Sequence, residues 1–575
     1  MKPPIGPYVR LPATVEPWDP QSPFVALAVG ELVAMRRPDL TVEHIGSTAV
    51  PGLAGKGIID LAITTSAADV PAVAAMLVEL GFGPQSGPDP WPPTRPMLVG
   101  SFEVDGAAFR LHCHVMPDAH ELRGDLAFRD ALRADSSLVE EYAALKSGIV
   151  EGGVLEPHQY TYRKQAWIAD VQRRLGVERR PISPPATIGI LGGGQLGRML
   201  ALAARAMGYR IAVLDPDPDC PAAAVAERVV VAGYDDVGGA LRLAELSDVV
   251  TYELEHVAAE VVDAVDAVRP VHPGRLPLRV TQDRLEERHF VESAGVLVAP
   301  WREVRTAEDV RAACRDIGRP LRLKVATGGY DGRGQLRLTD PADAEDALSR
   351  LGRPVGEALL AEVELAFRSE LSIVVARDIG GRVATFPVAC NRHDAGILVE
   401  SVAPAAIDAT VANQAASIGE RLALAAGLTG TLTAELFLMP DGNLVVNELA
   451  PRVHNSGHWT IEGAATSQFE QHIRAICGLG LGSTAALAPT AVVNLLGTGP
   501  ARPARPEPFG LAGVMADPAV HVHLYDKRQV FERRKMGHVT AIGTTIDEAL
   551  ARAQAAAAMV RWEDDETAPS AEQRA

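Results

Sequence analysis

Residues 431–452 read TLTAELFLMPDGNLVVNELAPR and contain two strand patterns around the turn sequence PDGN. If Met439 faces Leu444 across this four-residue turn, counting outward places Glu435 opposite Glu448 on one face of an antiparallel pair. Two carboxylates this close among apolar neighbours destabilise a hairpin unless a cation lies between them. The spacing therefore predicts a Mg²⁺ site, because Mg²⁺ prefers oxygen ligands. The alternative is an exposed carboxylate pair without a ligand.

A lysine and a glycine-rich segment come earlier in the chain and favour a polyphosphate site. Lys324 ends the apolar strand pattern LRLK, and residues 327–335 read TGGYDGRGQ, with four glycines among nine residues. Such a segment can close over phosphates, and Lys324 and Arg333 supply positive charge beside it. No G-K-[ST] sequence follows, so the segment is not a Walker A motif. A plain β-hairpin turn is the alternative interpretation.

Gly192, Gly194 and Gly197 form a G-x-G-x-x-G motif that follows an apolar strand pattern at 188–191 and precedes a helical pattern. A second strand pattern ends at Asp215. This arrangement is typical of a dinucleotide-binding βαβ unit, but it also suits any phosphate at the start of a doubly wound sheet. An NAD-dependent oxidoreductase that uses these glycines and Asp215 is therefore one alternative function.

The composition bounds the class of protein. The chain has 575 residues, 47% of them hydrophobic and 22% charged, which suits a soluble chain of about four domains. A net charge of −18 argues against non-specific nucleic-acid binding. The five cysteines include no C-x-x-C pair and the N-terminus lacks a signal-peptide core, so a cytoplasmic location is expected. The uncharged stretch 475–501 holds five glycines and two prolines, which predicts a helix end, a loop and a buried strand instead of a membrane span.

Several longer motifs occur in a fixed order between residues 187 and 562. They are ILGGGQLGRM, KVATGGYDGRGQ, NRHDAGIL, NELAPRVHNSGHWT and YDKRQVFERRKMGH. Together they resemble the 5-(carboxyamino)imidazole ribonucleotide synthase family of ATP-grasp ligases, the PurK type, for which the NSGHWT segment is highly specific. The resemblance implies that ATP phosphorylates bicarbonate to carboxyphosphate, and that the amine of 5-aminoimidazole ribonucleotide captures the carboxyl group in purine biosynthesis. It also implies Mg²⁺, a homodimer, and catalysis by charge neutralisation and positioning.

The resemblance assigns residues to each ligand. The residues expected to bind ATP are Arg284, Lys324, Gly329, Tyr330, Asp331, Gly332, Arg333, Gly334, Gln335, Glu362, Glu370, His393, Asn447 and Glu448. Those expected to bind the acceptor nucleotide or bicarbonate are Gly194, Gln195, Leu196, Asn455, Ser456, Lys527, Arg534 and Lys535. The expected catalytic residues are Asp331, Arg333, Arg452 and His454, and the expected metal ligands are Glu435 and Glu448. Asp331 would orient or deprotonate the attacking amine.

The pair Val325-Ala326 departs from the family pattern, which carries a basic residue at this point. The loss of a positive charge beside the phosphate loop puts nucleotide affinity in doubt. A second alternative is therefore a non-catalytic, nucleotide-binding scaffold protein. The departure removes no carboxylate and no lysine of the predicted site.

Residues 1–175 carry a different set of motifs. The sequence EHIGSTAVPGLAGKGIIDLAI at 43–63 and the strand pattern FRLHCHVM resemble the GrpB family, which is related to nucleotidyltransferases. The resemblance implies a nucleotidyltransferase-like α/β fold and a nucleotide-related role, although Asp60-Leu61-Ala62 lacks the second acid of a D-x-D metal motif. Residues that could line a pocket are Glu43, His44, Gly46, Ser47, Lys56, Asp60, His112 and His114. Alternatively, the histidines are structural.

The chain is thus expected to combine α/β and α+β domains. The predicted parts are, in order, a GrpB-like nucleotidyltransferase-fold domain (1–175), a proline-rich linker (176–186), a doubly wound pre-ATP-grasp domain (187–295), the ATP-grasp lobes (296–485), a small β-rich C-terminal domain (486–562) and a polar tail (563–575). The expected ligands are ATP, Mg²⁺, bicarbonate and a small-molecule acceptor, with neither nucleic acid nor membrane as a partner.

Overall fold

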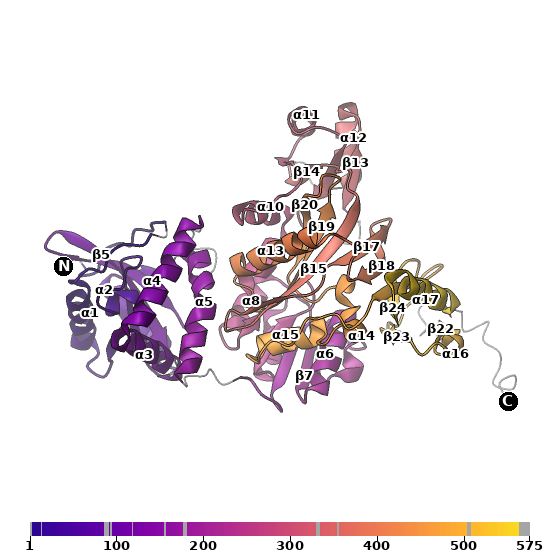
Figure 1. Ribbon diagram of the computed structural model, residues 1–575. Coiled ribbons are helices and arrows are strands. Elements are labelled where there is room, and N and C mark those ends of the chain that lie inside the picture. The colour runs from indigo at the N-terminus through magenta and orange to yellow at the C-terminus, as the bar shows by residue number, and fades with distance from the viewer. Residues whose placement is uncertain are drawn as a thin grey trace. The chain divides into compact units, whose positions relative to one another are not determined.

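A computed structural model describes residues 3–12, 14–85, 91, 95–117, 119–153, 157–175, 181–328, 334–352, 356–502 and 508–562. The chain forms two compact units (Figure 1), one of Met1–Pro181 with Asp266–Val268 and one of Ile182–Val265 with Arg269–Ala575. Both units mix helices and sheets, which confirms the predicted class. No helix in the described part of the chain is long and apolar enough to cross a membrane.

The first unit is built on a five-stranded sheet of order β1-β2-β5-β4-β3. Its elements are α1 (Ser22–Arg36), β1 (Val42–Ile45), β2 (Ile58–Thr64), α2 (Val70–Leu80), β3 (Gly83–Pro84), β4 (Met97–Val104), β5 (Ala107–Met116), α3 (Ala119–Ala134), α4 (Ser136–Glu151) and α5 (Pro157–Arg174). Alternate β2 residues Ile59, Leu61 and Ile63 pack in the core with α1 and α2, while Ala62 packs with Leu122 of α3. Asp60 therefore lies on the sheet face toward α3.

The second unit begins with a parallel sheet of order β10-β9-β6-β7-β8. Its elements are β6 (Thr187–Leu191), α6 (Gln195–Ala206), β7 (Arg210–Asp215), β8 (Arg228–Val231), α7 (Val237–Glu245), β9 (Val249–Tyr252), α8 (Ala259–Asp266), β10 (Val271–His272), α9 (Arg275–Gln282) and α10 (Arg284–Ser293). One face packs on α6 and the other on α7 and α8, as expected for a doubly wound sheet.

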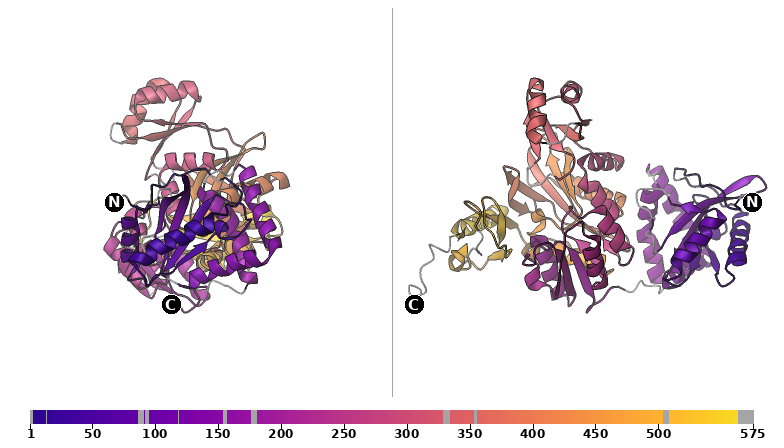
Figure 2. Two further views of the ribbon diagram at one scale, coloured as in Figure 1. Left: turned by 90° about the vertical axis from the view of Figure 1, so that its left-hand side faces the viewer. Right: turned by 180° about the vertical axis from the view of Figure 1, so that it is seen from behind.

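A small lobe follows, with a four-stranded sheet of order β11-β14-β12-β13. Its elements are β11 (Trp301–Val304), α11 (Ala307–Asp316), β12 (Leu321–Val325), β13 (Gln335–Leu338), α12 (Ala344–Leu351) and β14 (Leu359–Val363). Both helices pack on one face of this sheet. In both views of Figure 2 the lobe stands at one end of the second unit.

The remaining strands form one large sheet of order β20-β19-β15-β17-β18-β21-β24-β23, with β16 beside β15. Its elements are β15 (Ser369–Arg377), β16 (Val383–Thr385), β17 (Ala389–Asp394), β18 (Ile397–Ala403), α13 (Ala409–Ala425), β19 (Gly430–Leu438), β20 (Leu444–Ala450), α14 (Thr460–Gly463), α15 (Gln468–Ile476), β21 (Thr490–Leu496), β23 (Val520–Leu524), β24 (Lys535–Ile542) and α17 (Ile546–Met559). Three short elements complete the unit: β22 (Pro508–Phe509), α16 (Leu511–Val514) and β25 (Arg561–Trp562).

The stretch 475–501 contains the end of α15, a loop and the largely buried strand β21, which confirms that prediction. Strand β21 pairs with β18 of the ATP-grasp part. Strands β21, β24 and β23 therefore extend the ATP-grasp sheet, whereas β22 and β25 pair with each other in a separate two-stranded sheet.

Candidate active site

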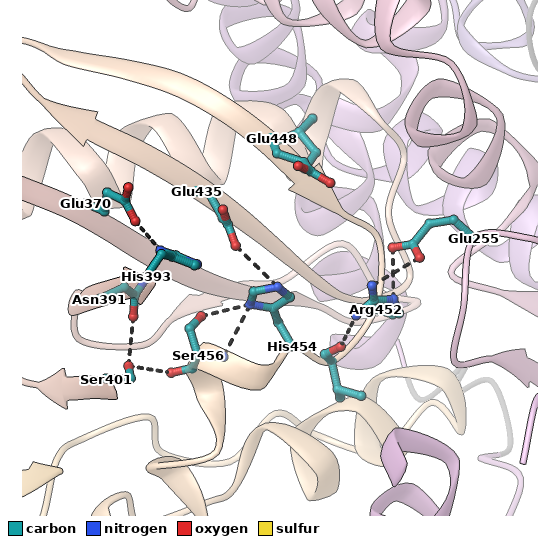
Figure 3. Close-up of polar contacts among 12 residues, drawn as sticks. Glu255, Glu370, Asn391, His393, Ser401, Glu435, Glu448, Arg452, His454 and Ser456 are labelled. Carbon is teal, nitrogen blue, oxygen red and sulfur yellow. Dashed lines mark hydrogen bonds and ion pairs between the residues drawn. The ribbon is translucent and has the colours of Figure 1, made fainter. Parts of the chain in front are cut away.

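Glu435 on β19 and Glu448 on β20 are directly opposite each other, as the hairpin sequence predicts (Figure 3). The predicted register was nevertheless wrong near the turn. Leu438, not Met439, pairs with Leu444, and an irregularity between Leu436 and Glu435 shifts the register by one residue before the two glutamates meet. The carboxylate pair thus depends on a β-bulge that simple counting from the turn does not include.

The surroundings of the two carboxylates differ. Glu435 Oε1 lies 3.4 Å from His454 Nε2, whereas Glu448 Oε2 lies 3.4 Å from Arg284 Nη1. Burial and the charge of Glu448 raise the pKa of Glu435 to about 7. Removal from water also raises the pKa of Glu448, but Arg284 and Lys324 outweigh that effect and the pKa is lowered. The Glu435 carboxyl therefore needs a further positive charge to stay ionised at neutral pH.

A divalent cation between the two carboxylates would supply that charge. The Glu448 side chain is 46% exposed, so an ion can reach the pair from solvent. Two carboxylates on one strand pair form the hard-oxygen donor set that Mg²⁺ takes from proteins, the remaining positions being filled by water and phosphate oxygens. The donor set therefore fits Mg²⁺, with Glu435 and Glu448 as the protein ligands.

Lys324 is fixed by a buried ionic network between the small lobe and α10. Its ammonium contacts the Glu362 carboxylate, which also accepts from Arg288 Nη2 at 2.9 Å. Arg288 in turn pairs with Glu287 at 3.0 Å and donates to the Asn447 carbonyl at 2.8 Å. These four charged side chains are buried. The assignment of Glu362 to ATP stays a prediction, whereas its contact with Lys324 gives it a positioning role. Arg288 and Glu287 were missed in the sequence, because nothing local marks them.

The predicted phosphate loop is tied to α10 by backbone contacts. Arg284 N–H donates to the Ala326 carbonyl at 2.9 Å, and Val325 N–H donates to the Gly334 carbonyl at 2.8 Å. Gln335 pairs with Lys324 across β12 and β13. Gly329, Tyr330, Asp331, Gly332 and Arg333 lie outside the described residues, so the expectations for them stay predictions.

Glu370 and His393 lie side by side on the large sheet (Figure 3), where the His393 Nδ1 contacts the Glu370 carboxylate. Burial lowers the pKa of His393, but Glu370 and Glu435 outweigh this effect and the pKa is raised. The two residues predicted to contact ATP therefore act as one polar pair on β15 and β17.

The segment after β20 forms the wall beside Glu435. Arg452 makes a two-point ion pair with Glu255, at 2.8 and 3.0 Å. Burial and the charge of Arg452 keep the pKa of His454 well below its ordinary value. Ser456 N–H donates to His454 Nδ1 at 3.3 Å, so the Nε2 of the neutral ring carries the proton that points at Glu435. Ser456 O accepts from Ser401 Oγ at 3.2 Å. The structure thus brings three of the predicted residues to the carboxylate hairpin.

The glycine motif lies where a dinucleotide site would be, but its donors are already engaged. Glu253, which directly follows β9, accepts from Gly197 N–H at 2.6 Å and from Gly194 N–H at 2.5 Å. Asp215 accepts from Gly193 N–H at 2.8 Å and from Tyr234 Oη at 2.7 Å. The two carboxylates thus occupy the N–H groups of Gly193, Gly194 and Gly197, which would otherwise bind the pyrophosphate of a dinucleotide. This arrangement argues against the NAD alternative. Among the described residues, no acceptor meets the N–H groups of Gln195 or Leu196, which stay available to an anion.

Substituting Gly192 with Ala should destabilise the second unit. Gly192 has a φ of 104°, and a Cβ there would lie 2.5 Å from Glu253 Cγ and collide with Leu254. Backbone strain and overpacking together are expected to cost about 2–4 kcal/mol. Thermal unfolding of the full chain should show a lower midpoint. Gly238→Ala on the exposed side of α7 is the matched control and should leave the midpoint within a degree or two, since Ala favours a helix. An equal shift in both variants would contradict this.

Four protein-family profiles match the sequence. The GrpB protein profile covers residues 12–174, and the ribonucleotide synthetase preATP-grasp domain covers 185–282. The ATP-grasp domain covers 289–469, and the phosphoribosylaminoimidazole carboxylase C-terminal domain covers 490–552. The order of the four profiles is that of the predicted domains.

Individual relatives identify the family of the chain more specifically than the four profiles do. The chain is 40% identical over 376 residues to the N5-carboxyaminoimidazole ribonucleotide synthase of Bacillus subtilis (strain 168), covering 65% of this chain and 95% of that protein. The chain belongs to the N5-carboxyaminoimidazole ribonucleotide synthase family. A crystal structure of the ADP complex of purK, N5-carboxyaminoimidazole ribonucleotide synthetase, matches with a TM-score of 0.61 and 41% identity, covering 66% of this chain and 98% of that chain. The Aspergillus clavatus enzyme in complex with ADP and 5-aminoimidazole ribonucleotide matches with a TM-score of 0.59 and 28% identity, covering 66% of this chain and 98% of that chain.

Two of the basic residues predicted to bind the acceptor, Lys527 and Arg534, lie on the loop between β23 and β24, and the third, Lys535, begins β24. Arg528 pairs with Asp219 at 3.0 Å, and Arg198 of α6 lies 3.7 Å from Asp526. The loop therefore packs near the start of α6, where the Gln195 and Leu196 N–H groups are available. Lys535 lies close enough to His454 and Glu435 to influence the pKa of both. These positions fit the predicted acceptor site.

The departure at Val325-Ala326 from the synthase-family pattern has a structural explanation. Val325 belongs to the apolar core of the small lobe, and Ala326 is also buried. Their contacts with Gly334 and Arg284 use backbone atoms only. Residues 325, 326 and 334, which flank the predicted phosphate loop, are therefore held by backbone contacts that need no basic side chain at this point.

In the GrpB-like unit the structure gathers some of the predicted residues. Asp60, His112 and His114 lie together, and the Gly46-Ser47 turn packs against Asp60 and Gly55. Glu43 is instead paired with Arg129 at 3.1 Å, and His44 contacts Thr48 Oγ1 at 3.1 Å. Burial lowers the pKa of His44 to about 4, so that ring is neutral.

Proposed function

We propose that the second unit carboxylates 5-aminoimidazole ribonucleotide to N5-carboxyaminoimidazole ribonucleotide in de novo purine biosynthesis, using ATP and bicarbonate. The observation that carries the proposal is the hairpin pair Glu435 and Glu448 facing Lys324 in a chain of the synthase family. The Aspergillus clavatus relative, whose structure holds ADP and 5-aminoimidazole ribonucleotide, supports both substrates. Mg²⁺, bicarbonate, a homodimer and a cytoplasmic location are further parts of the proposal.

The chemistry proceeds in two steps. A bicarbonate oxygen attacks the γ-phosphorus of ATP, which forms carboxyphosphate and releases ADP. The amine nitrogen of the acceptor then attacks the carboxyl carbon, and phosphate leaves as the nitrogen loses a proton. Bound Mg²⁺ would neutralise charge on the phosphates.

The residues of this chain hold the reactants and stabilise charge. In this proposal Lys324, which contacts Glu362, binds the transferred phosphoryl group, and Arg284 adds a second cation. Arg452 is oriented by its two contacts with Glu255, and His454 offers a neutral ring next to Glu435. The proton from the acceptor amine is assigned to Asp331 or solvent.

The test is ADP release by the purified full chain. ADP formation should require the acceptor ribonucleotide and bicarbonate together, because carboxyphosphate has no productive partner without the amine. Omitting either one should lower the rate by at least about tenfold. ATP binding without acceptor-dependent ADP formation would favour the scaffold alternative, and NADH binding would favour the oxidoreductase.

Lys535→Met should weaken acceptor binding more than it slows turnover. A lost charge-assisted contact to a ribose phosphate costs about 1.5–3 kcal/mol, so KM for the ribonucleotide should rise roughly 10- to 100-fold. KM for ATP should change little. Arg552 of α17 is paired with Asp517 and with Glu548 of the same helix. Arg552→Met removes this cation and serves as the matched control. A KM rise for ATP alone would place Lys535 at the other substrate.

A further inference from the structure

A cluster of two histidines and one carboxylate lies on one face of the N-terminal sheet. Strands β2 and β5 run parallel, with Asp60 opposite His112 and Ala62 opposite His114. The three ligand-bearing side chains therefore share a face, as alternating residues in a strand do. Asp60 Oδ1 lies 3.3 Å from His112 Nδ1 and 3.9 Å from His114 Nε2. All three candidate ligand atoms lie within 4.8 Å of one another, close enough for small side-chain movements to bring them to one metal ion.

The surroundings of the cluster fix the direction of its rings. The second nitrogen of His112, Nε2, lies 3.1 Å from Tyr8 Oη. Metal-binding histidines are commonly held in this way, through a hydrogen bond at the ring nitrogen that does not bind the metal. The Trp91 ring packs edge-on against His114, with 5.3 Å between the ring centroids. Each of the three side chains is at least partly buried, so their orientation does not depend on free surface rotamers.

Three lysines lie in the same unit without a carboxylate partner. Lys56 Nζ and Lys164 Nζ both approach the Tyr160 ring, at 5.1 and 5.3 Å from its centroid. Lys146 Nζ lies 4.6 Å from the Tyr142 ring and donates a hydrogen bond to the Ala54 carbonyl. Among the described residues, no Asp or Glu forms an ion pair with any of the three lysines. Burial lowers the pKa of Lys56 to about 8, and the charge of Lys164 lowers it further, while Asp60 opposes the shift. Partly buried ammonium groups without a carboxylate partner are costly, so an anion is expected next to Lys56 and Lys164.

We propose that Asp60, His112 and His114 bind one zinc-like divalent metal ion, and that an oxyanion of the phosphate type completes its coordination next to Lys56 and Lys164. Three protein ligands leave a fourth position of a tetrahedral site open, as in metal sites that bind an exchangeable ligand. The nearby ammonium groups select an anion for that position. The Gly46-Ser47 turn brings backbone against the Asp60 carboxylate, which helps hold the ligand in place.

The competing explanation is an ordinary structural ion pair between Asp60 and the two histidines. Such a pair would explain the short distances to Asp60, but it would not explain Lys56 and Lys164, which have no carboxylate partner among the described residues and lie near enough to Asp60 to interact with its charge. The two explanations differ in whether the full chain takes up a metal ion that the histidine variant does not.

The experiment titrates the full chain with Co²⁺, a visible-absorbing probe for this ligand set, and compares it with His112→Gln/His114→Gln. Because Glu435 and Glu448 are also expected to take a divalent ion, the difference between the two chains is the measurement. The parent should bind one more Co²⁺ ion than the double variant. The affinity of the double variant for Co²⁺ at this site should be lower by at least about 100-fold, a larger loss than removal of an outer hydrogen-bond partner causes. Tyr8→Phe, which removes only the outer contact of His112, should weaken it by about tenfold.

Two further measurements test the oxyanion and the specificity of the histidine substitutions. Inorganic phosphate should change the Co²⁺ spectrum of the parent and have a weaker effect on Lys56→Met. His521→Ala on β23 is the matched control for losing a histidine and should bind Co²⁺ like the parent, while acceptor-dependent ADP release should be unchanged in every N-terminal variant. Identical Co²⁺ titrations of the parent and the double variant would overturn the metal site. A spectrum that phosphate does not alter would overturn the oxyanion.

Discussion

Glu448→Gln should remove acceptor-dependent ADP formation almost completely. The substitution keeps the shape of the side chain but removes the charge that the hairpin offers to a cation, and it leaves Arg284 without its carboxylate partner at 3.4 Å. Removing one group that stabilises developing charge typically costs a factor of about 10²–10³ in kcat. Losing a ligand for Mg²⁺ should cost at least that much here, since the transfer depends on charge neutralisation. The measurement is kcat/KM for ADP release at saturating bicarbonate.

Asp441→Asn is the matched control for Glu448→Gln. Asp441 lies in the turn of the same hairpin, where it caps Asn443 N–H at 3.0 Å and is exposed to solvent. Its loss removes an acidic charge from the hairpin without touching the carboxylate pair, so activity should stay within about twofold. Chelating divalent ions from the parent enzyme should reproduce the defect of Glu448→Gln. Full activity of Glu448→Gln would contradict both the metal site and the ligase function.

The carboxylate hairpin shows how far local sequence patterns can be trusted. The turn at 440–443 and the alternation on both sides identify the hairpin and its functional pair, because the period of two is a local property. The sequence contains no comparable signal for the irregularity between Glu435 and Leu436, so counting gave the right pair through the wrong register. Near the turn the observed pairing is offset by one residue from the predicted register. The irregularity between Glu435 and Leu436 shifts it back by one residue, so Glu435 still pairs with Glu448.

Other parts of the site depend on contacts between distant segments. Arg288 looks like any charged residue of an amphipathic helix, and only the fold places it between Glu362 of β14 and Glu287. Glu253 closes the glycine motif because β9 ends next to β6 in the parallel sheet. The position of Glu253 beside the glycine motif could have been predicted, because the carboxyl ends of adjacent parallel strands meet at one edge of a sheet. The motif alone favoured a dinucleotide, and the residue that argues against it lies 56 positions away.

Arg288→Met should destabilise the second unit by about 3–5 kcal/mol, because removing one member of a buried ionic network leaves charges without partners. The Arg288 side chain is 1% exposed and is the partner of Glu287 and Glu362 as well as of the Asn447 carbonyl. Lys324 still contacts Glu362 in this variant, so the carboxylate that mainly loses its cationic partner is that of Glu287. Calorimetry of the full chain should show a lower midpoint for the transition of the second unit and no shift for the first. Arg305→Met, whose side chain is 54% exposed, should shift neither.

The defect of Arg288→Met should also shrink as the pH falls. Burial already raises the pKa of Glu287 to about 7 although Arg288 lowers it, so losing the arginine raises the pKa further. A carboxyl whose pKa is higher in the folded state than in the unfolded state destabilises the fold increasingly as pH rises from the unfolded pKa to the folded one. The difference in midpoint between the parent and Arg288→Met should therefore be larger at pH 8 than at pH 5.5, where the unpaired carboxyl is protonated and neutral. A difference that does not change with pH would mean that the arginine stabilises the unit through packing alone.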